Sequence, residues 1–148
     1  MSAARLKEKL KRFVELDGSD KWLFLRAVGW LAVARMMLII TPFKQLSAKF
    51  SAKPHADSVD PDPDYLRRVS FAVSAAANNV PWRSDCFPQA IAARILLNRK
   101  GYDSTIHLGV ERTGSNTVAG HAWLTCGDTT VTGGEQADHF AEIHRLGE

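Results

Sequence analysis

The sequence predicts an α+β protein, with helices along roughly the first two thirds of the chain and an antiparallel sheet in the last third. Two observations carry this prediction. Up to Lys100 the apolar residues recur every three or four positions, which is the spacing of helices that bury one face. After Gly101 the spacing shortens to about two, which is typical of half-buried strands. Helices followed by strands that pair through short turns define the α+β class.

The length and composition indicate a single folded domain. With 148 residues, 45% of them apolar, the chain can bury one proper core but hardly two. Its two cysteines are too few for a disulfide framework and suit a reducing compartment. The basic N-terminus lacks an apolar segment followed by a small-residue cleavage site, so we expect no export and a cytoplasmic location.

Two helices are expected before Pro42. Residues 5–16 place apolar side chains at helical spacing among lysines and arginines, and residues 21–40 form a longer, strongly apolar helix that Pro42 ends. A membrane span is the alternative interpretation of the longer helix. Arg26 and Arg35 oppose it, because each would cost about 2.5–3.5 kcal/mol at the bilayer centre and they lie on opposite sides of the helix. We therefore favour burial against the domain or a partner over membrane contact.

The charge is divided unevenly along the chain. Up to Lys53 there are eleven Lys and Arg against four Asp and Glu, whereas the remainder has eight against twelve. This division predicts an N-terminal helical region at residues 1–53, basic and apolar, that docks on an acidic partner, an anionic lipid surface or nucleic acid. The remaining residues, 54–148, would form a second region with another role. A solvated basic helix face is the other interpretation of the first region.

The remaining elements follow from turn signals and periodicity. Prolines and small polar residues mark residues 47–64 as a loop or linker. Two helices then span residues 65–79 and 86–100, and Gly101 caps the second. Strands are expected at 105–110, 119–126 and 129–132, the last two joined by a hairpin turn at Gly127 and Asp128.

A lone cysteine at a helix start and a lone histidine in a strand suggest acyl-transfer chemistry, whose partners meet only in the fold. Ser84 or Asp85 can cap the helix that Cys86 opens, and the helix dipole then favours the thiolate that attacks a carbonyl. Free N–H groups of the first turn can donate to the developing oxyanion. His121 would act as the general base and then as the acid for the leaving amine, with Trp123 keeping water out.

A third group should orient the imidazole, and the hairpin narrows the choice. If position 126 pairs with 129, then His121 falls opposite 134, and one extra loop residue moves its partner to 135. Glu135 is therefore the favoured third catalytic residue, in addition to Cys86 and His121. Two other acids are alternatives. Asp128, at the hairpin tip, is seven residues of extended strand away from His121, and Asp138 could reach the ring only if the chain curls back. A further alternative is that no acid orients the ring.

Other interpretations of these residues stay open. Cys86 can be a small core residue and His121 a surface residue, which would make the chain a non-catalytic binding module. Cys126, mid-sheet and beside Thr125, is expected to be structural. A zinc site would draw on Cys86, Cys126, His121, His139 or His144, but the two cysteines do not form a short ligand pair. No phosphate-binding or dinucleotide-binding motif is present, so we expect no cofactor and no metal.

Four stretches of the chain carry a resemblance to a known family. They are 81–90 (PWRSDCFPQA), 96–102 (LLNRKGY), 106–110 (IHLGV) and 120–124 (GHAWL). Together with the N-terminal helices that end at Thr41-Pro42-Phe43, they resemble the stand-alone transglutaminase-like cysteine peptidases that remove leader peptides in lasso-peptide biosynthesis. The resemblance covers almost the whole chain. It implies a transglutaminase-like, papain-like core in which the nucleophile helix packs on the antiparallel sheet, preceded by N-terminal helices.

The resemblance implies a cysteine endopeptidase. Cys86 would attack the amide between leader and core peptide, His121 would carry the proton, and water would hydrolyse the acyl-enzyme. The family often has an aspartate at the position that Gly133 occupies here. Either Glu135 or a backbone or polar group would then orient the ring. An acyltransferase on the same fold, in which an amine resolves the acyl-enzyme, is the nearest rival function.

The resemblance also implies partners. The substrate would be a precursor peptide. Members without a fused leader-recognition domain depend on a separate small leader-recognition protein, and we expect no such domain in this chain. Residues 1–53 would then dock on that protein or on the ATP-dependent cyclase that closes the lasso ring. A basic membrane- or nucleic-acid-associated protein is the remaining alternative, and the peptidase interpretation involves no nucleic acid.

Overall fold

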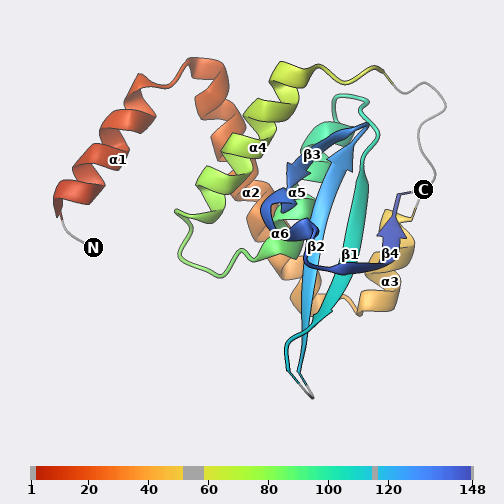
Figure 1. The fold of residues 1–148 in the computed structure, drawn as a ribbon. Helices are drawn as coiled ribbons and strands as arrows, with labels where there is room; N and C mark the ends of the chain where they lie inside the picture. Colours follow the sequence, from red (N-terminus) through yellow and green to blue (C-terminus); the bar gives the residue numbers. More distant parts are fainter. Residues whose placement is uncertain (1–2, 52–58, 115–116, 148) are drawn as a thin grey trace.

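The structure is a computed structural model that describes residues 3–51, 59–114 and 117–147. It confirms the predicted α+β class, with helices first and a four-stranded antiparallel sheet after them (Figure 1). The helices are α1 (Ala3–Glu15), α2 (Gly18–Ile40), α3 (Phe43–Phe50), α4 (Pro63–Ala77), α5 (Cys86–Asn98) and the short α6 (Gly134–Ala137). The strands are β1 (Thr105–Arg112), β2 (Val118–Cys126), β3 (Thr129–Thr132) and β4 (Ala141–Leu146), in the spatial order β3-β2-β1-β4.

Most of the predicted elements are present. The four long helices and the three strands expected from the sequence correspond to α1, α2, α4, α5, β1, β2 and β3, with ends that differ by three residues or fewer. Pro42 follows α2 as expected, and Thr41 before it adopts an extended backbone. These boundaries are set by local signals, namely capping residues, prolines and glycines, which the sequence displays directly.

The prediction of a loop from residue 47 is wrong at its start, because α3 continues to Phe50. Leu46 and Phe50 lie one turn apart on the same side of this short helix, and both are buried. The pattern has only two buried positions and is followed by prolines, so periodicity alone does not reveal it. Residues 52–58 of the expected loop lie outside the described residues.

Sequence periodicity also missed β4 and α6. β4 pairs antiparallel with β1 at the edge of the sheet, and it carries one extra residue, Ile143, opposite the step from Leu108 to Gly109. Only Leu146 of β4 is buried, so the strand lacks the alternation by which a half-buried strand is recognised. α6 is a single turn, too short to show any period.

Helix α5 lies at the centre of the core. It packs against α2 and α4 and, on its other side, against β2 with β1 and β3. Ala90, Ala92 and Ala93 are fully buried, and their small side chains let neighbouring elements approach closely. Ile91 and Leu96 supply much of the buried apolar volume. The start of α5, where Cys86 lies, is therefore held by the core of the domain.

Helix α2 buries one face and leaves the other exposed. Leu23, Ala27, Leu31 and Ala34 follow the helical spacing and are buried against α4 and α5. By length and composition alone α2 could cross a membrane, but its buried face belongs to the core of the domain. The opposite face is apolar and exposed, and its members are Trp22, Leu25, Val33, Met36, Ile39 and Ile40.

The two regions predicted on either side of residue 53 share one hydrophobic core. Buried residues of α2 and α3 and of the sheet belong to the same cluster, for example Leu31, Leu46 and Ile106. Their division into a docking part and a catalytic part stays a prediction.

Candidate active site

Cys86 is the first residue of α5, and its thiol is half-buried. Asp85 occupies the capping position with an extended backbone, but its side chain makes no capping hydrogen bond. Gln89 Nε2 instead donates to the carbonyl oxygen of Ser84 at 2.7 Å, which ties the turn before Cys86 to the first turn of the helix. The thiol thus lies at the positive end of α5, beside N–H groups that no capping side chain occupies.

His121 lies in β2, on the face of the sheet away from α5. Successive residues of a strand alternate between faces, and Leu124 and Cys126 belong to the core under α5. His121, Trp123 and Thr125 therefore point to the opposite face. Figure 1 shows α5 behind the sheet and the connection from α6 to β4 crossing in front of β2 and β1.

The His121 ring is oriented by a backbone carbonyl. Its Nε2 lies 2.8 Å from the carbonyl oxygen of Gly133. A carbonyl oxygen can only accept, so Nε2 carries the proton of the neutral ring and Nδ1 keeps its lone pair. Within the described residues, Nδ1 has no hydrogen-bond partner. The geometry thus leaves Nδ1 as the basic nitrogen.

The hairpin delivers Gly133 to this position. Cys126 pairs with Thr129 as predicted, but an irregularity between Leu124 and Thr125 inserts one extra residue, so that Leu124 pairs with Thr132. β3 then ends, and Gly133 turns the chain into α6 with a φ of 74°. A Cβ at Gly133 would lie 2.6 Å from the Ala122 carbonyl oxygen and 3.1 Å from His121 Nε2. Only glycine combines this backbone with this close approach.

The structure does not bond the predicted acid to the histidine. Glu135 lies on α6 with its side chain exposed, and the described residues show no hydrogen bond or ion pair between it and His121. Asp138 ends α6 and Asp128 lies in the hairpin turn, and both are exposed. The partner of His121 Nε2 is the Gly133 carbonyl, and an orienting role for Glu135 stays a prediction.

A stack of aromatic rings fixes the plane of the His121 ring. The Trp123 indole lies between the rings of His107, at 5.3 Å and 7°, and of His121, at 6.0 Å and 20°. Phe140 also lies against the His121 ring, with centroids 4.9 Å apart and planes tilted by 31°. His107 is hydrogen-bonded to Glu142 at 3.0 Å and to Thr125 at 2.8 Å. Sequence analysis missed this group, although alternation does place residues 121, 123 and 125 on one face.

Cys126 has the environment of a structural thiol. It is 2% exposed, and its Sγ–H donates to the carbonyl oxygen of Asp103 at 3.1 Å. Burial raises the pKa of the Cys126 thiol, and the charge of Asp103 acts in the same direction. Its thiolate is therefore disfavoured, which leaves Cys86 as the accessible nucleophile of the two cysteines.

Cys86 and His121 belong to elements that pack together, but they are not bonded in this structure. Helix α5 packs on β2, and α6 packs on β2 as well. No hydrogen bond joins the Cys86 thiol to the His121 ring in the part of the chain that is described. β3 pairs with β2 only from Leu124 onward. Among the described residues, the part of β2 before Leu124 therefore has no strand on that side, and this edge of β2, next to α6, is unpaired.

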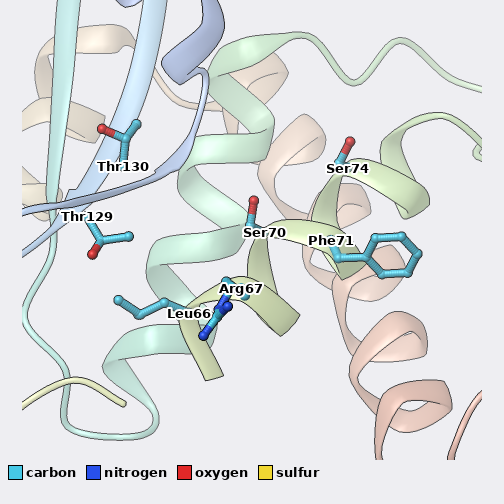
Figure 2. A pocket seen from close by; sticks show the side chains of 7 residues that line it. All are labelled: Leu66, Arg67, Ser70, Phe71, Ser74, Thr129 and Thr130. Carbon is cyan, nitrogen blue, oxygen red and sulfur yellow. The ribbon is translucent and has the colours of Figure 1, made fainter. Parts of the chain in front are cut away.

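A surface hollow of about 350 Å³ lies elsewhere, between α4 and β3. Figure 2 shows Ser70 and Ser74 presenting their hydroxyls from α4, while Phe71 points away from β3. None of the predicted catalytic residues lines it. Among the described residues, no three or more His, Cys, Asp or Glu side chains gather in a way that could hold a metal ion.

Comparison with known families assigns the chain to a superfamily. The family model described as the transglutaminase-like superfamily matches residues 28–145, and the chain belongs to this superfamily. Its members are in general cysteine proteases or acyltransferases. The matched residues begin within α2 and include Cys86, His121 and Gly133. No curated protein and no solved structure matches the chain.

Proposed function

We propose that the protein is a cysteine endopeptidase that removes the leader from a ribosomally made lasso-peptide precursor. One observation carries the proposal: His121 holds its Nε2 proton on the Gly133 carbonyl, which leaves Nδ1 as a base in a superfamily of thiol enzymes. The chemistry of the superfamily requires such a base near a cysteine at a helix start, where Cys86 stands. The resemblance of the sequence motifs around Cys86 and His121 to those of leader peptidases supports the choice of a leader peptide as substrate.

The layout of the fold favours an approach of Cys86 to His121. Arg94 of α5 donates a hydrogen bond to the Leu146 carbonyl, and Leu146 shares a row of the sheet with Ile106 and Leu124. Cys86 lies eight residues before Arg94, about 12 Å along a helix. His121 lies three residues before Leu124, about 10 Å along a strand.

The step from Arg94 back to Cys86 and the step from Leu124 back to His121 run in the same direction. α5 ends close to the start of β1, which pairs with the end of β2, so α5 and β2 point the same way (Figure 1). This layout favours Cys86 and His121 at about the same level along β2, near its uncovered edge. Catalytic hydrogen bonds in structures without substrate are often long and tighten when the substrate binds. We propose that the ring and the thiol meet at this edge.

The reaction proceeds in two stages. His121 Nδ1 takes the Cys86 proton, and the thiolate adds to the carbonyl carbon of the amide that joins leader to core peptide. N–H groups at the start of α5 donate to the oxyanion. The imidazolium gives its proton to the leaving amine as the C–N bond breaks, and an acyl-enzyme forms. Water, deprotonated by the same Nδ1, then adds to the thioester and releases the carboxylate and the thiol.

Product analysis tests the reaction class. Incubation of the chain with precursor peptide and leader-recognition protein should give two fragments whose summed mass exceeds that of the precursor by one water. An added primary amine should not appear in the products. Incorporation of that amine as the main product would instead assign the chain to the acyltransferases of the superfamily.

The exposed face of α2 is proposed as the docking surface for the leader-recognition protein. It presents Trp22, Leu25, Val33 and Met36 to solvent, in the basic part of the chain. A contiguous apolar face of this kind is typical of interaction sites. The ATP-dependent cyclase is the second proposed partner of the same region.

Charge placed on this face tests the docking. The double variant Leu25→Glu/Met36→Glu should weaken binding of the leader-recognition protein by about tenfold or more, measured by titration calorimetry. Both side chains are about half exposed, so the fold should be retained. Phe71→Glu on α4, which is 64% exposed, is the matched control and should bind as the wild-type chain does. Unchanged affinity of the double variant would contradict docking through α2.

A further inference from the structure

We propose that His107 and Glu142 form a positioning pair for His121, acting through the Trp123 indole that lies between the two histidine rings. This inference rests on the proposed function, because it concerns the orientation of the base. His107 touches neither the thiol nor the histidine base within the described residues. It acts on the plane in which the His121 ring is held.

The rings are brought together by the register of β1 and β2. His107 is the cross-strand partner of Trp123, and Gly109 is the partner of His121. A Cβ at Gly109 would lie 2.9 Å from both Phe140 Cβ and Trp123 Cζ3. The absence of a side chain at Gly109 therefore makes the space that the indole and Phe140 fill. The indole stacks on both histidine rings, and Phe140 contacts the His121 ring at a tilt.

His107 is fixed at both ring nitrogens. Nδ1 lies 3.0 Å from Glu142 Oε2 and Nε2 lies 2.8 Å from Thr125 Oγ1, and the residue is only 9% exposed. Arg145 Nε donates to the other oxygen of Glu142. That hydrogen bond lowers the pKa of Glu142, and the bond to His107 adds to the effect. Glu142 is thus a carboxylate that accepts from Nδ1–H of His107.

One hydrogen bond is not enough to fix the His121 ring. The bond to the Gly133 carbonyl sets the direction of Nε2 but permits rotation about that bond. The Trp123 and Phe140 faces restrict this rotation, and hence the direction in which Nδ1 points. His107 lies within 7° of parallel with the indole and cannot turn without losing its two bonds. An apolar ring at position 107 could still pack against the indole. Without the hydrogen bonds to Glu142 and Thr125, however, nothing would hold that ring in one plane.

The stack also suits the charged state of the base. When His121 takes the thiol proton, its imidazolium lies against the rings of Trp123 and Phe140, and aromatic rings attract cations. The charged or titratable groups around His107 are Glu142 and, behind it, Arg145, with His121 beyond the indole. A tilted indole would change the direction in which His121 Nδ1 points and the aromatic surface against which its imidazolium lies. The pH profile of cleavage therefore tests whether His107 and Glu142 position His121.

Variants at His107 separate its ring from its hydrogen bonds. His107→Phe keeps a ring and loses both bonds, whereas His107→Gln keeps a polar group and loses the ring. Each should lower kcat about tenfold, leave KM within about twofold, and shift the acid limb of the kcat–pH profile. Thr125→Val, which removes the Nε2 partner at nearly constant volume, should show a smaller change of the same kind. His144→Ala, an exposed histidine of β4, is the matched control and should match the wild type.

A second measurement keeps the inference distinct from the proposed function. Imidazole proton resonances of His121 in the full chain, assigned with His121→Gln, should move and titrate differently in His107→Gln and in Thr125→Val. If Cys86→Ala is inactive but the His107 variants keep the wild-type kcat and pH profile, the positioning pair is overturned and the peptidase stands. If no activity depends on Cys86, the proposed function fails. Unchanged His121 resonances in both variants would then overturn the pair by themselves.

Discussion

Replacing Cys86 with alanine should lower the rate of leader cleavage by about a thousandfold or more, because the acyl-enzyme can no longer form. The backbone N–H groups at the start of α5 remain in place, so precursor binding should be retained. The measurement is the single-turnover rate of precursor cleavage with the leader-recognition protein present. Retained cleavage in Cys86→Ala would show that this cysteine only packs, and would leave the chain as a binding module.

Cys126→Ala is the matched control for this experiment. It removes a thiol of the same chain that is 2% exposed and bonded to the Asp103 carbonyl. Loss of that buried contact should cost about 1 kcal/mol of unfolding free energy and leave the cleavage rate unchanged. Brief treatment with iodoacetamide should modify Cys86 and spare Cys126, because burial raises the pKa of the Cys126 thiol.

Gly133→Ala should lower the free energy of unfolding by about 2–4 kcal/mol. The backbone has a φ of 74°, and a Cβ would meet the Ala122 carbonyl oxygen at 2.6 Å. Relief of that contact must move the Gly133 carbonyl away from His121 Nε2. Urea denaturation followed by tryptophan fluorescence measures the change in unfolding free energy. The cleavage rate of Gly133→Ala should also fall in buffer without urea, where the variant is folded.

Gly120→Ala controls for a methyl group added beside His121. Gly120 lies in β2, its added Cβ would meet nothing within 4 Å, and its φ is not positive. Its unfolding free energy should stay within about 0.5 kcal/mol of the wild-type value. Equal effects of the two alanine variants would contradict the special role of Gly133. A side chain at position 133 would conflict with the backbone that follows β3.

The sequence predicted the parts of the site that depend on local signals. The start of α5 follows from a turn that ends at Asp85, and the pairing of Cys126 with Thr129 follows from a glycine-containing hairpin turn. The family of the fold was evident from the motifs around Cys86 and His121. In each case the information lies within about ten residues of the position it determines.

The remaining parts of the site depend on contacts that no local pattern records. The extra residue in β3 shifts the register by the one position that the count to Glu135 assumed, but β3 ends at Thr132, before it reaches His121. The partner found instead is a carbonyl, a group that every residue has. His107 meets Glu142 across 35 positions of sequence, through an edge strand whose exposed residues show no period.

The main-chain acceptor at Gly133 has a consequence for genetic dissection of this protein. A systematic alanine scan of its acids can remove carboxylates one at a time, yet it leaves the atom that holds the imidazole untouched. In the proposed mechanism three groups cooperate, and such a scan would report only two of them. Chemical synthesis that exchanges the amide oxygen for sulfur, or the following amide for an ester, would reveal the concealed member.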